Sequence, residues 1–161
     1  MLIRKASAEE MLELWGYRDI DHASPTAVYF YRNISSGNAV FFTTEHDGEL
    51  IGELYAFLDI EEDRDLADGT TTAYLCAFRI RKEYRGLGLG TRMMEAALED
   101  LKAMGFKYAA IGADDERHIG LYRRMGFTRA VKTCRSDPCA RDEKMLPEPV
   151  EAGFLLLKKD L

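Results

Sequence analysis

Apolar residues recur along this chain with two different periods, and these periods divide it into strands and helices. β-Branched, aromatic and other apolar residues dominate residues 70–81, which is typical of a strand. After a short glycine-rich segment, apolar residues return at spacings of three to four, as on the buried face of a helix. They are Leu89, Met93, Ala97, Leu101 and Met104. A strand is therefore predicted to run directly into a glycine-rich turn and a helix.

Two helices and a hairpin are predicted before that strand. Residues 2–6 are expected to form a first strand, and Ser7 with Glu10 forms the capping-box pattern that opens a helix. A Ser-Pro pair opens a second helix over residues 24–35, because proline is favoured at a first helical position. An Asp-Gly pair between two apolar runs predicts a hairpin within residues 39–60.

Strands and one helix are predicted to alternate after residue 105. We expect a strand at 107–112, a helix at 115–125 and a strand from 127 to about 134. Residues 135–149 contain three prolines and mixed charges, which predicts a long loop before a final strand at 152–158. The resulting order β-α-α-β-β-β-α-β-α-β-β indicates an α/β or α+β protein.

Composition and charge limit the number of domains, the location and the partners expected for this protein. Its 161 residues are expected to form a single domain, residues 1–161, with 47% apolar residues to build a core. No apolar run is long enough to span a membrane, and the N-terminus lacks the apolar stretch of a signal peptide, so a cytoplasmic location is expected. With 28 acidic against 22 basic residues the formal net charge is −6, which argues against nucleic acid as a partner.

Three cysteines add little chemistry by number or spacing. Their odd count argues against a disulfide framework. Cys134 and Cys139 are close in sequence, but no second Cys/His pair accompanies them, so no metal site is expected. Cys76 fits a buried strand position. The three histidines, His22, His46 and His118, are scattered singly along the chain.

The segment Arg85-Gly86-Leu87-Gly88-Leu89-Gly90 is the strongest candidate for function. Three glycines at alternate positions leave the main chain bare where the strand becomes a helix. Free N–H groups at a helix N-terminus, supported by the helix dipole, bind anions. The segment is therefore predicted to hold a phosphate or pyrophosphate; a turn that is glycine-rich only for close packing is the alternative.

Two common phosphate-binding patterns do not fit this segment. The Rossmann pattern Gly-x-Gly-x-x-Gly needs its third glycine one residue later, and a Walker loop needs a lysine before Thr91. ATP or NAD as the ligand of the loop is therefore kept only as a minor alternative.

The segment does match Arg/Gln-x-x-Gly-x-Gly/Ala, as Arg85-x-x-Gly88-x-Gly90, and so resembles a signature of the GNAT N-acetyltransferase superfamily. A second resemblance lies one helix and one strand further on, where Leu121-Tyr122 on a short helix is followed by Gly126-Phe127. Gly126 suits the left-handed position just after a helix. The resemblance covers roughly residues 70–127.

This resemblance implies the GNAT-like acyl-CoA N-acyltransferase fold, a mixed sheet with a parallel crossover around the glycine loop. It also implies acetyl-CoA as acyl donor, CoA as product and direct attack of an amine on the thioester. A bulge in the strand before the loop would leave main-chain groups for the pantetheine arm and the oxyanion. Tyr122 matches the tyrosine that can protonate the leaving thiolate. The cofactor-binding residues implied are Phe78, Arg79, Ile80, Arg85, Gly86, Leu87, Gly88, Leu89, Gly90, Thr91 and Asp115.

Several positions depart from the pattern that this resemblance implies. Asp115 stands where many relatives have an asparagine, and it also suits a helix N-cap. His118 stands where a small residue is usual. The general base is left open, because Tyr74 and Ala110 occupy positions where some relatives have a glutamate. The remaining candidates are Glu53, Asp59 and a chain of waters.

The amine acceptor is the least constrained part of the prediction. Carboxylates crowd residues 59–68, which favours a cationic amine, although a solvated acidic loop is the alternative. Such an amine would be a polyamine, an aminoglycoside-like amine, a lysine side chain or a peptide N-terminus. An aromatic group either walls the acceptor site or forms plain core: Trp15, Tyr17, Tyr29, Phe30 and Tyr31. A homodimer is left open, and a non-catalytic acyl-CoA-binding sensor or assembly domain is the alternative to an enzyme.

Overall fold

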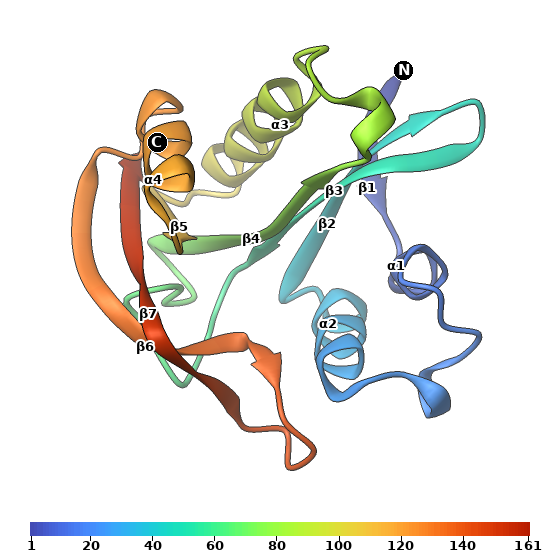
Figure 1. Cartoon of the computed structure of the whole chain (residues 1–161), viewed down its shortest axis with the longest axis horizontal. Helices are drawn as coiled ribbons and strands as arrows, with labels where there is room; N and C mark the ends of the chain where they lie inside the picture. The colour runs from blue at the N-terminus through green and yellow to red at the C-terminus, as the bar shows by residue number, and fades with distance from the viewer.

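One seven-stranded sheet runs through the computed structural model, which describes all 161 residues (Figure 1). Its strand order is β1-β2-β3-β4-β5-β7-β6, and only β4 and β5 pair in parallel. In chain order the elements are β1 (Leu2–Ala6), α1 (Ala8–Leu14), α2 (Pro25–Ser36), β2 (Ala39–His46), β3 (Glu49–Phe57), β4 (Thr72–Ile80), α3 (Leu89–Ala103), β5 (Tyr108–Ala113), α4 (Glu116–Arg124), β6 (Arg129–Arg141) and β7 (Pro147–Asp160). Two short 3-10 helices, Ile20–His22 and Lys82–Tyr84, complete the list. The predicted element order and mixed sheet are confirmed.

The helix starts follow from the side chains that cap them. Ser7 accepts a hydrogen bond from the Glu10 N–H, and the Glu10 carboxylate accepts one from the Ser7 N–H, which is the predicted capping box. Ser24 caps α2, with Pro25 at its first position, and Gly37 ends α2 in the left-handed conformation. No helix in the structure is both long and apolar enough to cross a membrane.

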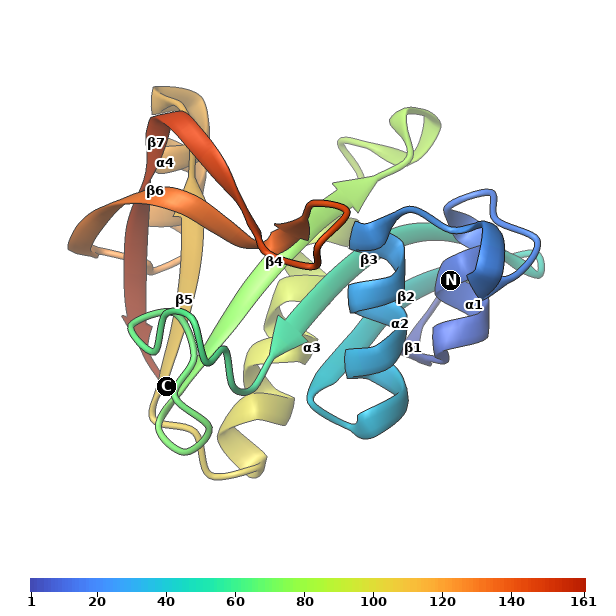
Figure 2. The ribbon, with the colours of Figure 1, turned by 90° about the horizontal axis from the view of Figure 1, so that it is seen from below.

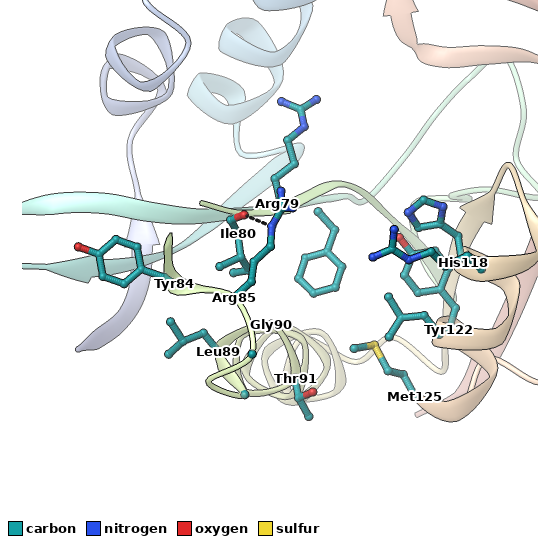
Figure 3. A pocket seen from close by; sticks show the side chains of 15 residues that line it. Arg79, Ile80, Tyr84, Arg85, Leu89, Gly90, Thr91, His118, Tyr122 and Met125 are labelled. Carbon is teal, nitrogen blue, oxygen red and sulfur yellow. Dashed lines mark hydrogen bonds between the residues drawn. The ribbon is translucent and has the colours of Figure 1, made fainter. Parts of the chain in front are cut away.

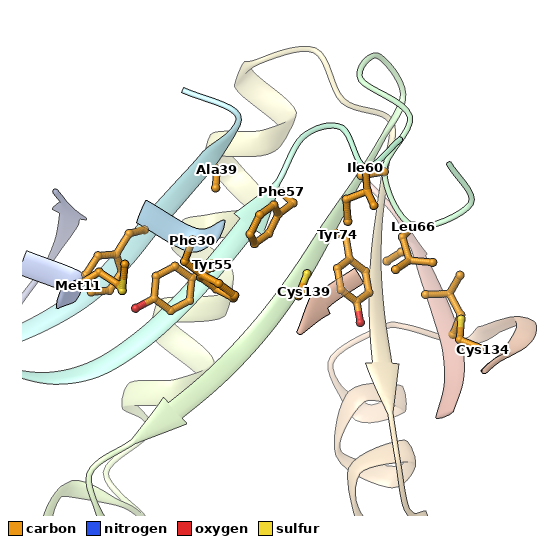
Figure 4. Packing of buried hydrophobic residues seen from close by; sticks show 14 of the residues in the cluster. Met11, Phe30, Ala39, Tyr55, Phe57, Ile60, Leu66, Tyr74, Cys134 and Cys139 are labelled. Atoms are coloured by element: carbon orange, nitrogen blue, oxygen red, sulfur yellow. The ribbon is translucent and has the colours of Figure 1, made fainter. Parts of the chain in front are cut away.

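Helices cover both faces of the sheet, and each face has its own core (Figure 2). Side chains alternate along β3, as strand geometry requires. Tyr55 and Phe57 pack against α1 and α2, whereas Leu54 and Ala56 pack against α3. Figure 4 shows Phe30 of α2 beside Tyr55 and Phe57, with ring centroids 5.0 and 5.1 Å away. Because β4 pairs with β3, the side chains of β4 opposite these residues face the same two cores.

The predicted long loop over 135–149 is wrong, because most of it belongs to two long strands, β6 and β7. Prolines interrupt a sheet only where their missing N–H is needed for pairing. Pro138 lies at an irregularity in the β6–β7 register, and Pro147 is the first residue of β7. β7 pairs with β5 only from Leu155 onward, so no second strand needs a hydrogen bond from the main-chain nitrogen of Pro149. Figure 2 shows the far ends of β6 and β7 leaving the sheet edge and reaching toward α2.

Strand β4 carries the predicted bulge. Tyr55 pairs with Cys76 and Glu53 with Arg79, so Ala77 and Phe78 together face only Leu54. Ala77 has φ of +51°, a left-handed conformation that costs an alanine about 1 kcal/mol or more. On its other edge β4 pairs with β5 only from Thr72 to Leu75. The second half of β4 is therefore unpaired on the β5 side, which opens the sheet there.

Candidate functional site

A cavity of about 410 Å³ lies where the end of β4, the glycine loop, the start of α3 and one face of α4 meet (Figure 3). Its walls contain three arginines, Arg79, Arg85 and Arg117, and no carboxylate. The complete lining is Phe78, Arg79, Ile80, Tyr84, Arg85, Gly86, Gly88, Leu89, Gly90, Thr91, Arg117, His118, Leu121, Tyr122 and Met125. The charge of these walls favours an anionic ligand.

The glycine loop supplies free hydrogen-bond donors to this cavity. None of the main-chain N–H groups from Gly86 to Thr91 donates within the chain. Gly88 precedes α3 at φ of +77°, which only glycine adopts readily, and no side chain caps the helix. The N–H groups and the positive end of the 15-residue helix α3 therefore meet at one point.

Arginine side chains at the loop differ in direction. The Arg85 Nε donates to the carbonyl of Ile80 at 2.9 Å, which holds the guanidinium at the loop. Figure 3 shows Arg79 pointing away from the glycine loop. The Arg79 Nη1 lies 3.6 Å from Glu53 Oε2, and the guanidinium lies 5.9 Å from the Trp15 ring. Arg85 is thus the better placed of the two to meet a phosphate.

A second cavity of about 320 Å³ occupies the opening between β4 and β5. It is lined by Tyr74, Leu75, Cys76, Ala77, Phe78, Ile111, Gly112, Asp114, His118, Tyr122, Asp137, Val150 and Phe154. Three of these residues, Phe78, His118 and Tyr122, also line the first cavity. The two cavities therefore meet at the bulge of β4 and the inner face of α4.

Tyr122 lies at this meeting point with only 7% of its surface exposed. Burial, followed by the nearby charges of Asp114 and Asp115, raises the pKa of the Tyr122 phenol to about 12. The phenol therefore keeps its proton at neutral pH. A buried hydroxyl at the junction of two cavities can donate that proton to a group that becomes negative there.

Most of the residues predicted to bind a cofactor surround the first cavity. Nine of the eleven line it, and the two that do not are Leu87 and Asp115. The Leu87 side chain points to solvent, with 60% of its surface exposed. Asp115 caps α4, because its Oδ1 accepts from the His118 N–H at 2.8 Å. The same oxygen lies 2.8 Å from His118 Nδ1, so Asp115 also orients that ring.

Sequence reasoning missed the rest of α4 as a cavity wall. Arg117, His118, Leu121 and Met125 line the first cavity together with Tyr122. Positions 117 and 118, 121 and 122, and 125 recur every three to four residues, which is the helical period and places all of them on one face. That period was the signal that could have found them.

Neither carboxylate named as a candidate base lines either of these two cavities. Glu53 is buried, and its Oε1 accepts from the indole Nε1 of Trp15 at 2.9 Å. The Asp59 Oδ2 atom lies 3.6 Å from the Arg64 Nη2 atom. Tyr74 and Ala110 are paired across β4 and β5, and only the tyrosine faces the second cavity.

The acidic segment does not form an open acidic surface at the site, contrary to expectation. Glu62 makes two hydrogen bonds to Arg141, at 2.9 and 3.0 Å. Asp63 and Asp65 both pair with Lys132, at 2.7 and 3.1 Å. None of these carboxylates lines either cavity. The segment instead ties the β3–β4 connection to β6.

The aromatic group of the first two helices is also structural in large part. The Trp15 ring packs 4.9 Å from Phe30 and 6.1 Å from Tyr55, and Tyr29 stacks on Phe57. None of these aromatic side chains lines the two cavities. The plain-core interpretation therefore holds for them.

Comparison with known proteins assigns the family. A profile described as Acetyltransferase (GNAT) family matches residues 6–127. The chain belongs to this family. A GNAT family acetyltransferase from Elizabethkingia anophelis, solved with acetyl-CoA bound, shares the fold with a TM-score of 0.64 at 14% identity, over 99% of this chain and 97% of that one. The predicted GNAT fold is therefore confirmed.

Curated relatives of this GNAT protein carry different names. An N-alpha-acetyltransferase from Sulfurisphaera tokodaii is 24% identical over 112 residues, which cover 66% of this chain and 66% of that protein. An L-methionine sulfoximine/L-methionine sulfone acetyltransferase from Pseudomonas aeruginosa is 28% identical over 116 residues, covering 71% of this chain and 64% of that protein. The matched regions thus span just under two thirds of these relatives.

Proposed function

We propose that this GNAT protein transfers the acetyl group of acetyl-CoA to a primary amine. The observation that carries the proposal is the junction of the two cavities at Tyr122. One cavity offers main-chain donors and arginines to a phosphate-bearing ligand. The other is a separate space, lined by both polar and apolar side chains, that ends at the same phenol. Two substrates entering from the two sides would meet there.

The first cavity suits the CoA portion of the donor. The free N–H groups from Gly86 to Thr91 would bind the pyrophosphate, with Arg85 and Arg117 beside it. The peptide-like pantetheine arm would lie along the unpaired half of β4, beside Phe78 and Ile80. Main-chain groups at the bulge would then be available to the thioester carbonyl.

The chemistry follows from the thioester, which a neutral amine can attack directly. The thiolate that leaves is a fairly good leaving group and needs only a proton. Tyr122 supplies it, because its phenol lies at the junction of the two cavities and is protonated at neutral pH. A small cationic molecule, a lysine side chain and a peptide N-terminus all present such an amine after losing a proton.

Ligand-dependent melting tests the donor half of this function. Acetyl-CoA and CoA are expected to raise the melting temperature, because a ligand that binds only the folded state stabilises it by mass action. ATP and NAD should have little effect. Gly88→Leu should still fold, because nothing lies within 4 Å of an added Cβ atom. It should abolish the melting shift, because φ of +77° disfavours leucine and the loop would not keep its conformation. Equal shifts from ATP and CoA would contradict the proposal.

Thiol release with a panel of amines tests the acceptor half. The panel should contain alkylamines, a polyamine, an aminoglycoside, a lysine peptide and a peptide with a free N-terminus. We expect thiol release above the hydrolytic background with at least one of them. A protein that binds acetyl-CoA but releases thiol with none would be an acyl-CoA-binding domain without this activity.

A further inference from the structure

The second cavity contains two carboxylates, and they differ in their surroundings. Asp114 and Asp137 are its acidic residues. The Asp114 side chain is 74% exposed and lies 3.1 Å from the His118 Nδ1, so it belongs to the rim. Asp137 is half-buried, reaches the cavity from β6, and pairs with no lysine, arginine or histidine. It is therefore the one carboxylate inside this cavity without a cationic partner.

The irregular end of β6 places Asp137 there. The register between β6 and β7 shifts on both sides of Asp137, so the strand bends at this point. The Asp137 Oδ1 accepts a hydrogen bond from the Cys139 N–H at 2.9 Å, which fixes the carboxylate. No side chain donates to either of its oxygens. Arg141, at the end of the same strand, is engaged by Glu62.

The groups facing Asp137 come from every element around the cavity. β4 contributes Tyr74 and Cys76, α4 contributes His118 and Tyr122, and Asp114 follows β5. Glu148 on β7 pairs with Asp137 in the β6–β7 register. Burial raises the pKa of Asp137 above its ordinary value, while the Cys139 N–H and Arg141 act against that rise. A carboxylate with a raised pKa accepts a proton more readily than an exposed one.

We propose that Asp137 binds the ammonium group of the acceptor in the second cavity and takes its proton before the attack. This inference rests on the proposed acetyl transfer and names the general base that the sequence left open. The cavity wall combines polar groups with apolar side chains, among them Leu75, Phe78, Ile111, Val150 and Phe154. The acceptor class is therefore a primary amine whose ammonium group reaches Asp137.

The protons balance as follows. The ammonium gives one proton to Asp137, which passes it to solvent. The amine nitrogen then forms a bond to the thioester carbonyl carbon, and the carbonyl electron pair moves to oxygen. When that pair returns, the C–S bond breaks, the thiolate takes the Tyr122 proton, and the new amide nitrogen loses its second proton to water. Tyr122 regains a proton from water, and one proton is released overall.

Asp137→Asn with two kinds of amine tests this role. The isosteric amide keeps the Oδ1 acceptor for the Cys139 N–H, so the fold should persist, and the CoA-induced melting shift checks it. We expect kcat/KM for the most active alkylamine of the panel to fall on the order of a hundredfold at neutral pH. For methoxyamine, which is unprotonated at neutral pH, kcat/KM should fall little. The loss in kcat/KM of Asp137→Asn with the alkylamine should become smaller as the pH approaches the pKa of that amine.

Glu148→Gln is the matched control, because it removes the exposed carboxylate that β7 places opposite Asp137, and Glu148 lines neither cavity. It should leave kcat/KM for both amines nearly unchanged. Equal losses with both amines in Asp137→Asn, no loss with either, or the same loss in Glu148→Gln would each overturn the role of Asp137. If the unaltered protein binds CoA but acetylates no amine, the proposed function fails, and the inference fails with it.

Discussion

Gly90 lies against the ring of Phe78, so that a Cβ atom on residue 90 would come within 3.1 Å of the Phe78 Cζ atom. Gly90 belongs to the first turn of α3, and Phe78 belongs to the bulge of β4. This contact sets the free N–H groups of the loop at a fixed distance from the junction of the two cavities. A ligand that binds both the loop N–H groups and the junction must match that distance.

The first prediction follows from this contact. Gly90→Val should displace the Phe78 ring and weaken CoA binding by about tenfold or more, because overpacking a tight contact costs roughly 1–3 kcal/mol. Isothermal titration with CoA measures it. Gly120→Ala on α4 is the control, since its added Cβ would meet only the end of the Arg124 side chain, at 3.4 Å. An unchanged CoA affinity in Gly90→Val would show that the contact does not position the loop.

The second prediction concerns the proton donor. Tyr122→Phe keeps the ring and removes only the hydroxyl, so kcat should fall by roughly ten- to a thousandfold, while CoA affinity stays similar. Because burial raises the pKa of Tyr122 to about 12, the phenol keeps its proton while alkylamines lose theirs. The rate of the unaltered protein should therefore rise with pH as free amine accumulates, with no decline before the phenol ionises. A Tyr122→Phe variant with unaltered kcat would make this tyrosine structural.

The glycine loop and Tyr122 could be predicted because local sequence determines their positions. Gly88 must adopt a positive φ before α3, and Tyr122 lies four residues before Gly126, whose φ of +99° ends α4. Both depend on neighbours close in the chain. The capping box of α1 could be predicted for the same reason.

Asp137 could not be found in this way, because its role depends on pairing between distant segments. Three prolines near it indicated a loop, yet each occupies a position where the β6–β7 pairing tolerates it. The pairing of Asp63 and Asp65 with Lys132 joins residues far apart in sequence. Charge density alone therefore could not show that several of these carboxylates were already paired.

The third prediction reverses the expectation for the acidic segment. A triple variant, Glu61→Gln, Asp63→Asn and Asp65→Asn, should leave the KM for the amine within about twofold at low salt, because none of the three lines either cavity and two of them share Lys132. Glu62 is kept, since it holds Arg141. KM measured against salt concentration checks this. A raised KM with a flatter salt dependence would show that the segment attracts the amine from a distance.

The fourth prediction concerns the anchor that holds the β6–β7 end near α2. The Arg141 side chain is 4% exposed and Glu62 is 41% exposed, and the guanidinium lies 3.9 Å from the Tyr29 ring centroid. Arg141 also donates to the carbonyls of Pro138 and Met145. Glu62→Ala should destabilise the fold by about 3 kcal/mol, because it leaves a buried charge that cannot lose its proton.

Adding Arg141→Met to Glu62→Ala removes that stranded charge, so the double variant should recover about 1 kcal/mol or more in urea unfolding. The exposed pair Arg129–Asp160 on the same two strands serves as the comparison, with side chains 56% and 77% exposed. Asp160→Ala should change the free energy of unfolding by less than about 1 kcal/mol. If the double variant is no more stable than Glu62→Ala alone, the loss comes from packing and not from the buried guanidinium.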